Sequence, residues 1–268
     1  MANAIATANT VTIAGQPVPP HLIRPHALEA LRRSDGTIDW SPWYLTEEED
    51  MGQSGEQGQI IDVLQSSLRV LAEERGWSSV FLGSDNFFAW VDGEPYVQVS
   101  PDLYILDEPP STDEPMPTRW EVWRPGHRAP RFAVEVVSAR WQKDYDINPP
   151  RYDHLGVSEL VLADPDAFAR DLSDKGRAAF LVYRRSSADR LELTYRGNGP
   201  ALCAELDAHL CFRWSSPGRP RVRISRQPTG DDIVPTLAEK TAAQAAEIAA
   251  QADEIATLRA RLRDLQNS

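Results

Sequence analysis

Two acidic residues in β-prone stretches are the first candidates for chemistry in this chain. Glu135 lies in the segment RFAVEVVS, residues 131–138, and its neighbours on both sides are apolar. Asp102 follows a proline at the start of a second β-prone run, DLYIL. An ionised carboxylate in a buried strand is costly unless a partner neutralises it or it takes up a proton. Glu135 therefore needs a partner.

Strand alternation indicates that Asp102 can be this partner, if the two acids lie on the same face of neighbouring strands. Glu135 shares one face of its predicted strand with Ala133 and Val137. If the strand that begins at Asp102 lies beside it, the two carboxylates converge, and without a cation one of them would hold a proton. Mg²⁺ typically binds through one or two protein carboxylates, with waters and a substrate phosphate as its other ligands. The pair therefore predicts a divalent-metal site suited to phosphoryl displacement.

An amphipathic helix and a series of short strands are expected to position these acids. Apolar residues recur at spacings of three and four between residues 56 and 75, which predicts a helix that Gly76 ends. Asn148 is a candidate N-cap of a short helix that ends at Gly156. Strands are predicted at residues 79–83, 87–91, 96–100, 102–106, 132–137, 159–165, 179–185, 190–196 and 221–225. The order of these elements predicts an α/β fold, a mixed sheet with helices packed on it.

The chain is expected to divide into three parts. Residues 1–40 are rich in Ala, Thr and Pro with little periodicity, which predicts a mobile N-terminal arm. Residues 41–228 hold the predicted helices and strands and are expected to form the domain, including a long proline-rich loop at residues 107–130. Residues 236–268 differ in pattern and are expected to form a coiled-coil tail.

Heptad spacing marks this tail. One series of residues seven apart is Leu237, Gln244, Gln251, Leu258 and Leu265, and a second is Thr241, Ile248, Ile255 and Leu262. The two series interleave as the core positions of a coiled coil do, although polar residues weaken the first half. The pattern predicts a homo-oligomer through this coiled coil. The alternative is a single amphipathic helix packed on its own domain.

The composition is that of an ordinary globular protein, with 41% hydrophobic and 25% charged residues. The longest apolar runs are strand-sized and the N-terminus lacks the pattern of a secretory signal, so we expect a cytoplasmic protein with no membrane partner. Cys203 and Cys211 form no metal pattern, and two free thiols are favoured over a disulfide.

The charge is acidic overall but uneven along the chain. A net charge of −12 argues against a general nucleic-acid coat protein. Residues 119–151 nevertheless hold seven Lys and Arg against four Asp and Glu, and residues 213–226 hold five Arg and no acid. Each window could form a local patch that contacts nucleic acid, or its arginines could be ordinary solvated side chains at strand edges.

The candidate residues stand in an order that resembles a known family. The pair PD at residues 101–102, then EVV at 135–137, then DYDINPPRYDHLGVSELVLADP from residue 144 look like the Uma-type putative restriction endonuclease family of the PD-(D/E)XK nuclease superfamily. The resemblance covers roughly residues 43–215, and coiled-coil tails after the nuclease domain are common in that family. It implies a restriction-endonuclease-like mixed β-sheet core flanked by helices.

The resemblance also implies an activity and a set of site residues. It implies an endonuclease that hydrolyses DNA phosphodiester bonds with Mg²⁺ or Mn²⁺, with Asp102 and Glu135 as catalytic metal ligands. Glu56 would be a third acid, or else an exposed glutamate favoured by the helix dipole at the start of its helix. Asp146 matches an acidic position that often opens the helix after the glutamate strand, or it caps a turn.

The lysine of the superfamily is missing from its usual place. The superfamily pattern puts it two residues after the acid, where this chain has Val137. Relatives often carry the lysine on the following helix, and Lys143 and Arg151 lie in that region. Arginine cannot accept a proton but can stabilise phosphorane charge, whereas lysine can do either, so Lys143 is favoured over Arg151 as the catalytic cation.

Two further functions stay open at this point. The missing lysine and the acidic net charge would also suit a catalytically inactive binding module that assembles through its coiled coil. The same site could instead act on RNA or on branched ends, and the sequence does not choose among these substrates.

Overall fold

Six strands form the central sheet of the structure. The computed structural model describes residues 12–13, 16–17, 29–45, 55–109, 117–170, 172–215 and 218–267. In spatial order the sheet contains β11 (Leu191–Gly197), β10 (Phe180–Arg185), β9 (Glu159–Ala163), β8 (Phe132–Val136), β6 (Leu103–Asp107) and β3 (Val80–Gly83). Strands β8 and β9 run parallel, and the other neighbouring pairs run antiparallel. The predicted mixed α/β sheet is therefore confirmed.

Strand β8, which carries Glu135, is buried at every position, and so is its parallel neighbour β9. Parallel strands are usually covered on both faces and read as continuous apolar runs, which explains the stretches FAVEV and ELVLA. Alternate residues of β8 enter two different hydrophobic cores: Phe132, Val134 and Val136 enter one, and Ala133 enters the other.

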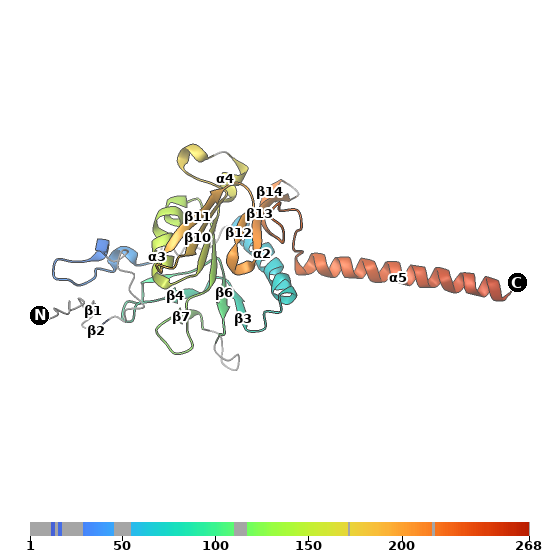
Figure 1. Cartoon of the computed structure of the whole chain (residues 1–268), viewed down its shortest axis with the longest axis horizontal. Coiled ribbons are helices and arrows are strands. Elements are labelled where there is room, and N and C mark those ends of the chain that lie inside the picture. Colours follow the sequence, from blue (N-terminus) through green and yellow to red (C-terminus); the bar gives the residue numbers. More distant parts are fainter. Residues whose placement is uncertain are drawn as a thin grey trace, which may run out of the picture.

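Helix α2 (Gly55–Glu74) covers the first of these faces with the apolar stripe that the sequence predicted. A three-stranded sheet shares this core (Figure 1) and consists of β12 (Ala201–Cys203), β13 (Ala208–Ser215) and β14 (Arg219–Ser225). Only β14 was predicted from the sequence. Strand β12 has three residues, and β13 mixes buried apolar and exposed polar residues, so neither gives a clear period.

The second face is covered by short helices and a second small sheet. Helix α3 (Asn148–Leu155) packs here, and the small sheet contains β5 (Gln98–Val99), β4 (Phe87–Ala89) and β7 (Arg119–Glu121). The predicted hairpin of β4 and β5 is present. The hairpin belongs to this small sheet because β4 also pairs with β7, a strand from the long proline-rich loop. Trp120 of β7 is buried and stacks on Phe88 of β4.

The short helix begins differently from the prediction. A π-helical turn, η4 (Lys143–Ile147), precedes α3, so Asn148 has helical φ and ψ and is not the N-cap. Gly156 ends α3 with φ +97°, as predicted. The remaining short elements are β1 (Thr12–Ile13), β2 (Gln16–Pro17), η2 (Glu29–Leu31), η3 (Ser41–Trp43), α4 (Pro165–Ala169), η5 (Ser173–Lys175) and η6 (Ala204–Leu206).

The N-terminal segment of residues 29–45 packs against the domain, which differs from the mobile arm expected over residues 1–40. Leu31, Ile38, Trp40 and Trp43 are buried. Both tryptophans pack edge-on against the buried imidazole of His154 in α3. Aromatic burial of this kind is strongly stabilising, and it fixes the segment on the domain. Most of residues 1–28 lie outside the described residues.

The C-terminal helix α5 (Leu237–Gln266) has no buried residue and projects away from the domain (Figure 1). Cys203 and Cys211 are both free and buried, as expected. Within the described part of the chain, none of the helices combines the length and the apolar character needed to cross a membrane.

Asp164, directly after β9, is buried and accepts hydrogen bonds from three other residues. Arg177 donates to both carboxylate oxygens at 2.8 Å. The backbone N–H of Ala167 donates at 2.9 Å and caps α4, and the hydroxyl of Tyr145 donates at 2.9 Å. The network connects the end of β9 and α4 to η4 and to the segment that contains Arg177.

We expect Asp164→Ala to lower the free energy of unfolding by about 3–5 kcal/mol, because it leaves the buried Arg177 guanidinium without its main partner. The matched control is Asp231→Ala, which removes an exposed partner of Arg213 and should cost less than about 1 kcal/mol. Chemical denaturation measures both values, and equal losses in the two variants would contradict this role for Asp164.

Candidate active site

The register between β6 and β8 sets Asp102 opposite Glu135. The paired residues are Tyr104 with Ala133 and Leu103 with Val134, and one further step along both chains brings the two acids together. The Asp102 carboxylate also accepts a hydrogen bond of 2.7 Å from the backbone N–H of Val136. The pairing of β6 and β8 therefore brings Asp102 and Glu135 close together, and their joint role as a site stays a prediction.

Burial makes this pair difficult to ionise. Glu135 is only 7% exposed, and burial raises its pKa well above the usual range, with the charges of Asp102 and Asp144 adding to the shift. The pKa of Asp102 is raised to about 7, mainly by burial and also by the charges of Asp144 and Asp85, against the hydrogen bond from the Val136 N–H, which lowers it. Two facing carboxylates in a site of low dielectric constant repel each other strongly.

Tyr152 of α3 orients the Glu135 side chain. Its hydroxyl donates a short hydrogen bond to Glu135 Oε1, and both side chains are buried. Burial and the neighbouring Glu135 raise the pKa of Tyr152 well above its usual value, so the hydroxyl remains a donor. The other oxygen of Glu135 is thereby left to face the remaining groups of the site.

A third acid near the pair is Asp144, which the sequence did not single out. Its carboxylate accepts hydrogen bonds from the backbone N–H of Ser138 at 2.9 Å and from the Ser138 hydroxyl at 3.1 Å. Burial raises the pKa of Asp144. Asp146, the acid that the sequence did nominate, is exposed. The π-helical turn η4 decides between the two, because it directs Asp144 inward and Asp146 outward.

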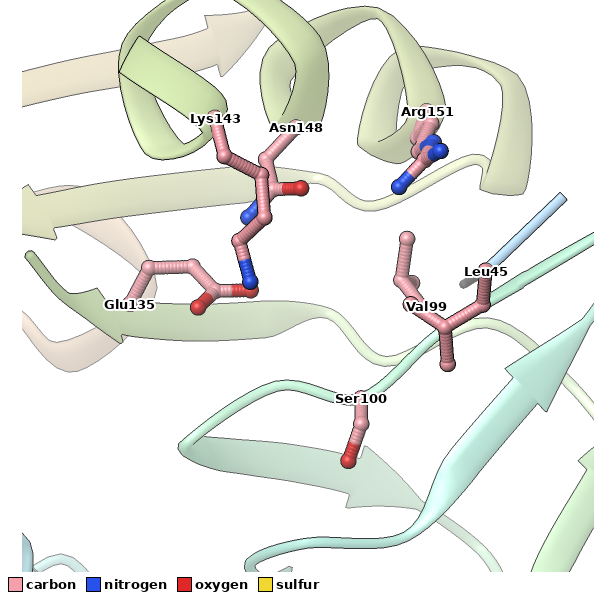
Figure 2. A pocket seen from close by; sticks show the side chains of 7 residues that line it. All are labelled: Leu45, Val99, Ser100, Glu135, Lys143, Asn148 and Arg151. Atoms are coloured by element: carbon pink, nitrogen blue, oxygen red, sulfur yellow. The ribbon is translucent and has the colours of Figure 1, made fainter. Parts of the chain in front are cut away.

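A small pocket opens beside Glu135. It has a volume of about 40 Å³ and is lined by Leu45, Val99, Ser100, Glu135, Lys143, Asn148 and Arg151. This space suits a few water molecules or an ion and is too small for a nucleotide. Figure 2 shows the Lys143 side chain running from its helical turn toward the Glu135 carboxylate, with Arg151 farther along the pocket.

Lys143 and Arg151 thus both reach the pocket, from different sides. The charge of Lys143 acts on Asp102, Glu135 and Asp144, where it lowers the pKa of each carboxyl against the effect of burial. Its Nζ lies 3.9 Å from Asp144 Oδ1. Arg151 is buried and lies 3.5 Å from the backbone carbonyl of Tyr44, in the packed N-terminal segment.

Glu56 is exposed in the first turn of α2 and is not among the residues that line the pocket. The next residue, Gln57, instead donates from Nε2 to the carbonyl of Val136 at 2.9 Å. A neutral amide in the first turn of a helix carries no sequence signal for a site. The contact between α2 and the end of β8 could therefore not be predicted.

The donor set fits a small, hard cation. Among the described residues no group of three or more His, Cys, Asp and Glu side chains forms a metal-binding cluster. Asp102 and Glu135 nevertheless supply the one or two carboxylates that Mg²⁺ typically takes from a protein. A cation between them would also relieve the repulsion that raises their pKa values.

The two basic windows are partly neutralised in the part of the chain that the structure describes. Three of the five arginines in residues 213–226 pair with acids: Arg213 with Asp231, Arg223 with Glu239 and Arg226 with Glu74. Arg221 contacts the neutral amide of Gln59. The other window contains the pairs Arg119 and Arg124 with Glu121, Arg128 with Glu108 and Arg131 with Asp107. The cations that line the pocket are Lys143 and Arg151.

The raised pKa values predict an unusual dependence of stability on pH. A carboxyl whose pKa is higher in the folded protein than in the unfolded chain makes folding less favourable as pH rises through that interval. In metal-free buffer we expect Asp102→Asn to be more stable than the wild type at pH 8, by roughly 1–3 kcal/mol. Asparagine can still accept the Val136 hydrogen bond. The gain should shrink as pH falls from about 7 toward 4.

Thermal unfolding with a chelator, measured across this pH range, tests the prediction. Glu56→Gln is the matched control, because it also neutralises one acid but at an exposed position. It should give no such gain. A loss of stability in Asp102→Asn that is the same at pH 5 and pH 8 would contradict the expectation.

Comparisons with known proteins give the family. A family model described as Uma2, putative restriction endonuclease, matches residues 47–206, which include the two facing acids and both cations of the pocket. A crystal structure of a putative nuclease belonging to DUF820 from Anabaena variabilis is similar with 15% sequence identity and a TM-score of 0.38, over 58% of this chain and 75% of that chain. No curated protein matches. Since the matched residues make up more than half of the 268, the chain belongs to the Uma2 putative restriction endonuclease family.

Proposed function

We propose that this protein is a metal-dependent endonuclease that hydrolyses phosphodiester bonds in DNA. Its family points to a nuclease. The observation that carries the proposal is the pair Asp102 and Glu135, which face each other across two strands beside a pocket that contains Lys143. DNA as the substrate and Mg²⁺ or Mn²⁺ as the cofactor are inferred from the family and the donor set.

Asp102 and Glu135 would hold the metal ion. When bound, Mg²⁺ lowers the pKa of a water molecule and offsets charge on a phosphate. The protein keeps the two carboxylates in place through the Val136 N–H on Asp102 and the Tyr152 hydroxyl on Glu135. These fixed contacts reduce the reorganisation needed when a substrate arrives.

Lys143 would stabilise the negative charge on the phosphoryl oxygens or orient the attacking water. Its side chain already points toward Glu135 (Figure 2). Arg151 would stabilise charge from the other side of the pocket, and it cannot accept a proton. Because the pocket holds only a few waters, the phosphate would enter at its mouth while the rest of the nucleic acid lies on the outer surface.

The alternative is a binding module that keeps the fold without catalysis and assembles through its tail. Val137, at the usual lysine position, is buried and apolar. The arginines of both basic windows are mostly paired, which leaves little positive surface for a duplex. Titration calorimetry with Mg²⁺ separates the two functions: a nuclease binds the ion at millimolar concentration through Asp102 and Glu135, and absence of binding favours the module.

We expect Glu135→Gln to lower DNA cleavage in Mg²⁺ or Mn²⁺ by at least about a hundredfold, because a metal ligand contributes several kcal/mol to the transition state. Glu56→Gln serves as control and should cleave nearly as fast as the wild type. Initial rates on a plasmid and on a labelled duplex give the measurement. Equal cleavage by the wild type and Glu135→Gln would reject the assignment.

The two cations can be ranked by a second comparison. We expect Lys143→Met to lose more cleavage than Arg151→Met, by roughly tenfold or more, because the charge of Lys143 acts on all three acids. Melting temperatures of both variants must accompany the rates, since Arg151 is buried and its loss also affects packing. A larger rate loss in Arg151→Met at unchanged stability would reverse the ranking.

A further inference from the structure

Helix α5 presents an apolar stripe that its own domain leaves uncovered. Along its last three turns the exposed fractions are 49% for Ile255, 54% for Leu258, 57% for Leu262 and 76% for Leu265. All four fall on the two heptad series of the tail. A contiguous row of exposed large apolar residues on a single helix is typical of an interface and costs free energy while it faces water.

The start of α5 is fixed to the domain. Thr236 and Glu239 form a capping box, and Arg223 donates to both carboxylate oxygens of Glu239. The first heptad residue, Leu237, packs against the domain core, and its N–H donates to the Ser66 hydroxyl at 3.0 Å. Leu237 is therefore used within the chain. The alternative of a helix packed along its own domain holds for this first turn only.

The heptad positions favour one kind of assembly. With Ile255 and Leu262 at the a positions, Leu258 and Leu265 take the d positions. Ile255 is β-branched, and within parallel coiled coils a β-branched residue at a with Leu at d favours two strands. In that orientation Glu254 at g also faces Arg259 at e of the other helix, which is an attractive pair.

Two glutamines in α5 favour the parallel orientation of the two helices more strongly than the pair of Glu254 and Arg259 does. Gln244 and Gln251 both occupy d positions. In a parallel, in-register pair each glutamine faces its own copy, so the two amides can hydrogen-bond to each other. An antiparallel pair centred on Ile255 and Leu258 would place Gln251 against Leu262, where the amide has no partner.

We propose that α5 beyond its first turn, from Thr241 to Leu265, forms a parallel two-stranded coiled coil with a second copy of this chain, with its apolar seam between Ile255 and Leu265. The occupant of the exposed stripe is this same stripe in the other copy. The polar first half of α5, between Leu237 and Ile255, spans about 27 Å of helix. Its weak seam leaves room for the two domains, which lie at the same end of the assembly.

The orientation has a consequence for the site, which rests on the proposed nuclease function. A parallel coil brings two pockets to one end of the dimer, where they could act on the two strands of one duplex. An antiparallel coil of these helices would hold the domains at opposite ends. The dimer itself does not depend on whether the protein cleaves DNA.

Light scattering on the full-length protein over a range of concentrations tests the dimer. We expect a mass of twice 29.9 kDa for the wild type and a twofold drop in mass for Leu262→Asp. The matched control is Ala260→Asp, which adds the same charge to the outer side of the helix and should remain a dimer. Since neither residue is buried, both variants keep the domain folded. A monomeric wild type, a larger oligomer, or a dimeric Leu262→Asp would overturn the proposal.

A cysteine placed near the end of the helix tests the orientation. In a parallel, in-register pair the two copies of position 265 meet, so Leu265→Cys should form an intermolecular disulfide under mild oxidation. The native Cys203 and Cys211 are buried and do not compete. Ala260→Cys, on the outer side, should cross-link at least tenfold less. A dimer in which Leu265→Cys cross-links no better than this control would exclude the parallel arrangement. Absence of DNA cleavage by an intact parallel dimer would reject the nuclease and leave this inference standing.

Discussion

The antiparallel register of β6 and β8 is the constraint on which the rest of this molecule depends. One residue beyond its last pair, it brings the half-buried Asp102 beside Glu135, which is only 7% exposed. Repulsion between like charges grows as the dielectric constant falls, so burial makes the pair resist ionisation unless positive charge is supplied. Lys143 supplies part of it. A slip of one residue in this register would turn Glu135 into the opposite core and leave no site.

The site forms where the hydrogen-bond ladder between β6 and β8 stops. The chain joins the sheet only at Leu103, the first residue of β6. The backbone of Val136, which lies past the partner of Leu103, therefore needs hydrogen-bond partners from outside β6. The Asp102 carboxylate accepts from its N–H, and the Gln57 amide donates to its carbonyl. Helix α2 and the segment before β6 are thereby joined at one residue, Val136, next to Glu135. The same contacts that complete the ladder hold the acid in position.

The strand pattern predicted the buried strand that carries Glu135 and the strand that follows Asp102, and the structure contains both as neighbours. Alternation also predicted the face of the strand on which Glu135 lies. It could not separate Asp144 from Asp146. That choice follows from a π-helical turn, which adds a residue to the turn and has no periodic signature. The packing of residues 29–40 was also missed, because Trp40 becomes informative only once His154 is known to lie beneath it. Its burial is a tertiary effect that overrides a composition typical of mobile arms.

Helix α2 contacts both the strand that carries Glu135 and the C-terminal helix α5. At its first turn Gln57 contacts the end of β8, and at its last turn Glu73 pairs with Lys240 of α5 at 2.8 Å. Since a helix is stiff along its axis, the direction in which α5 leaves the domain is set by the same element that braces the site strand. Two copies joined along their tails would inherit this direction on both sides of a two-fold axis. The separation of their two pockets would then be fixed by α2 and by the length of the polar half of α5, and substitutions there would change that separation without touching either carboxylate.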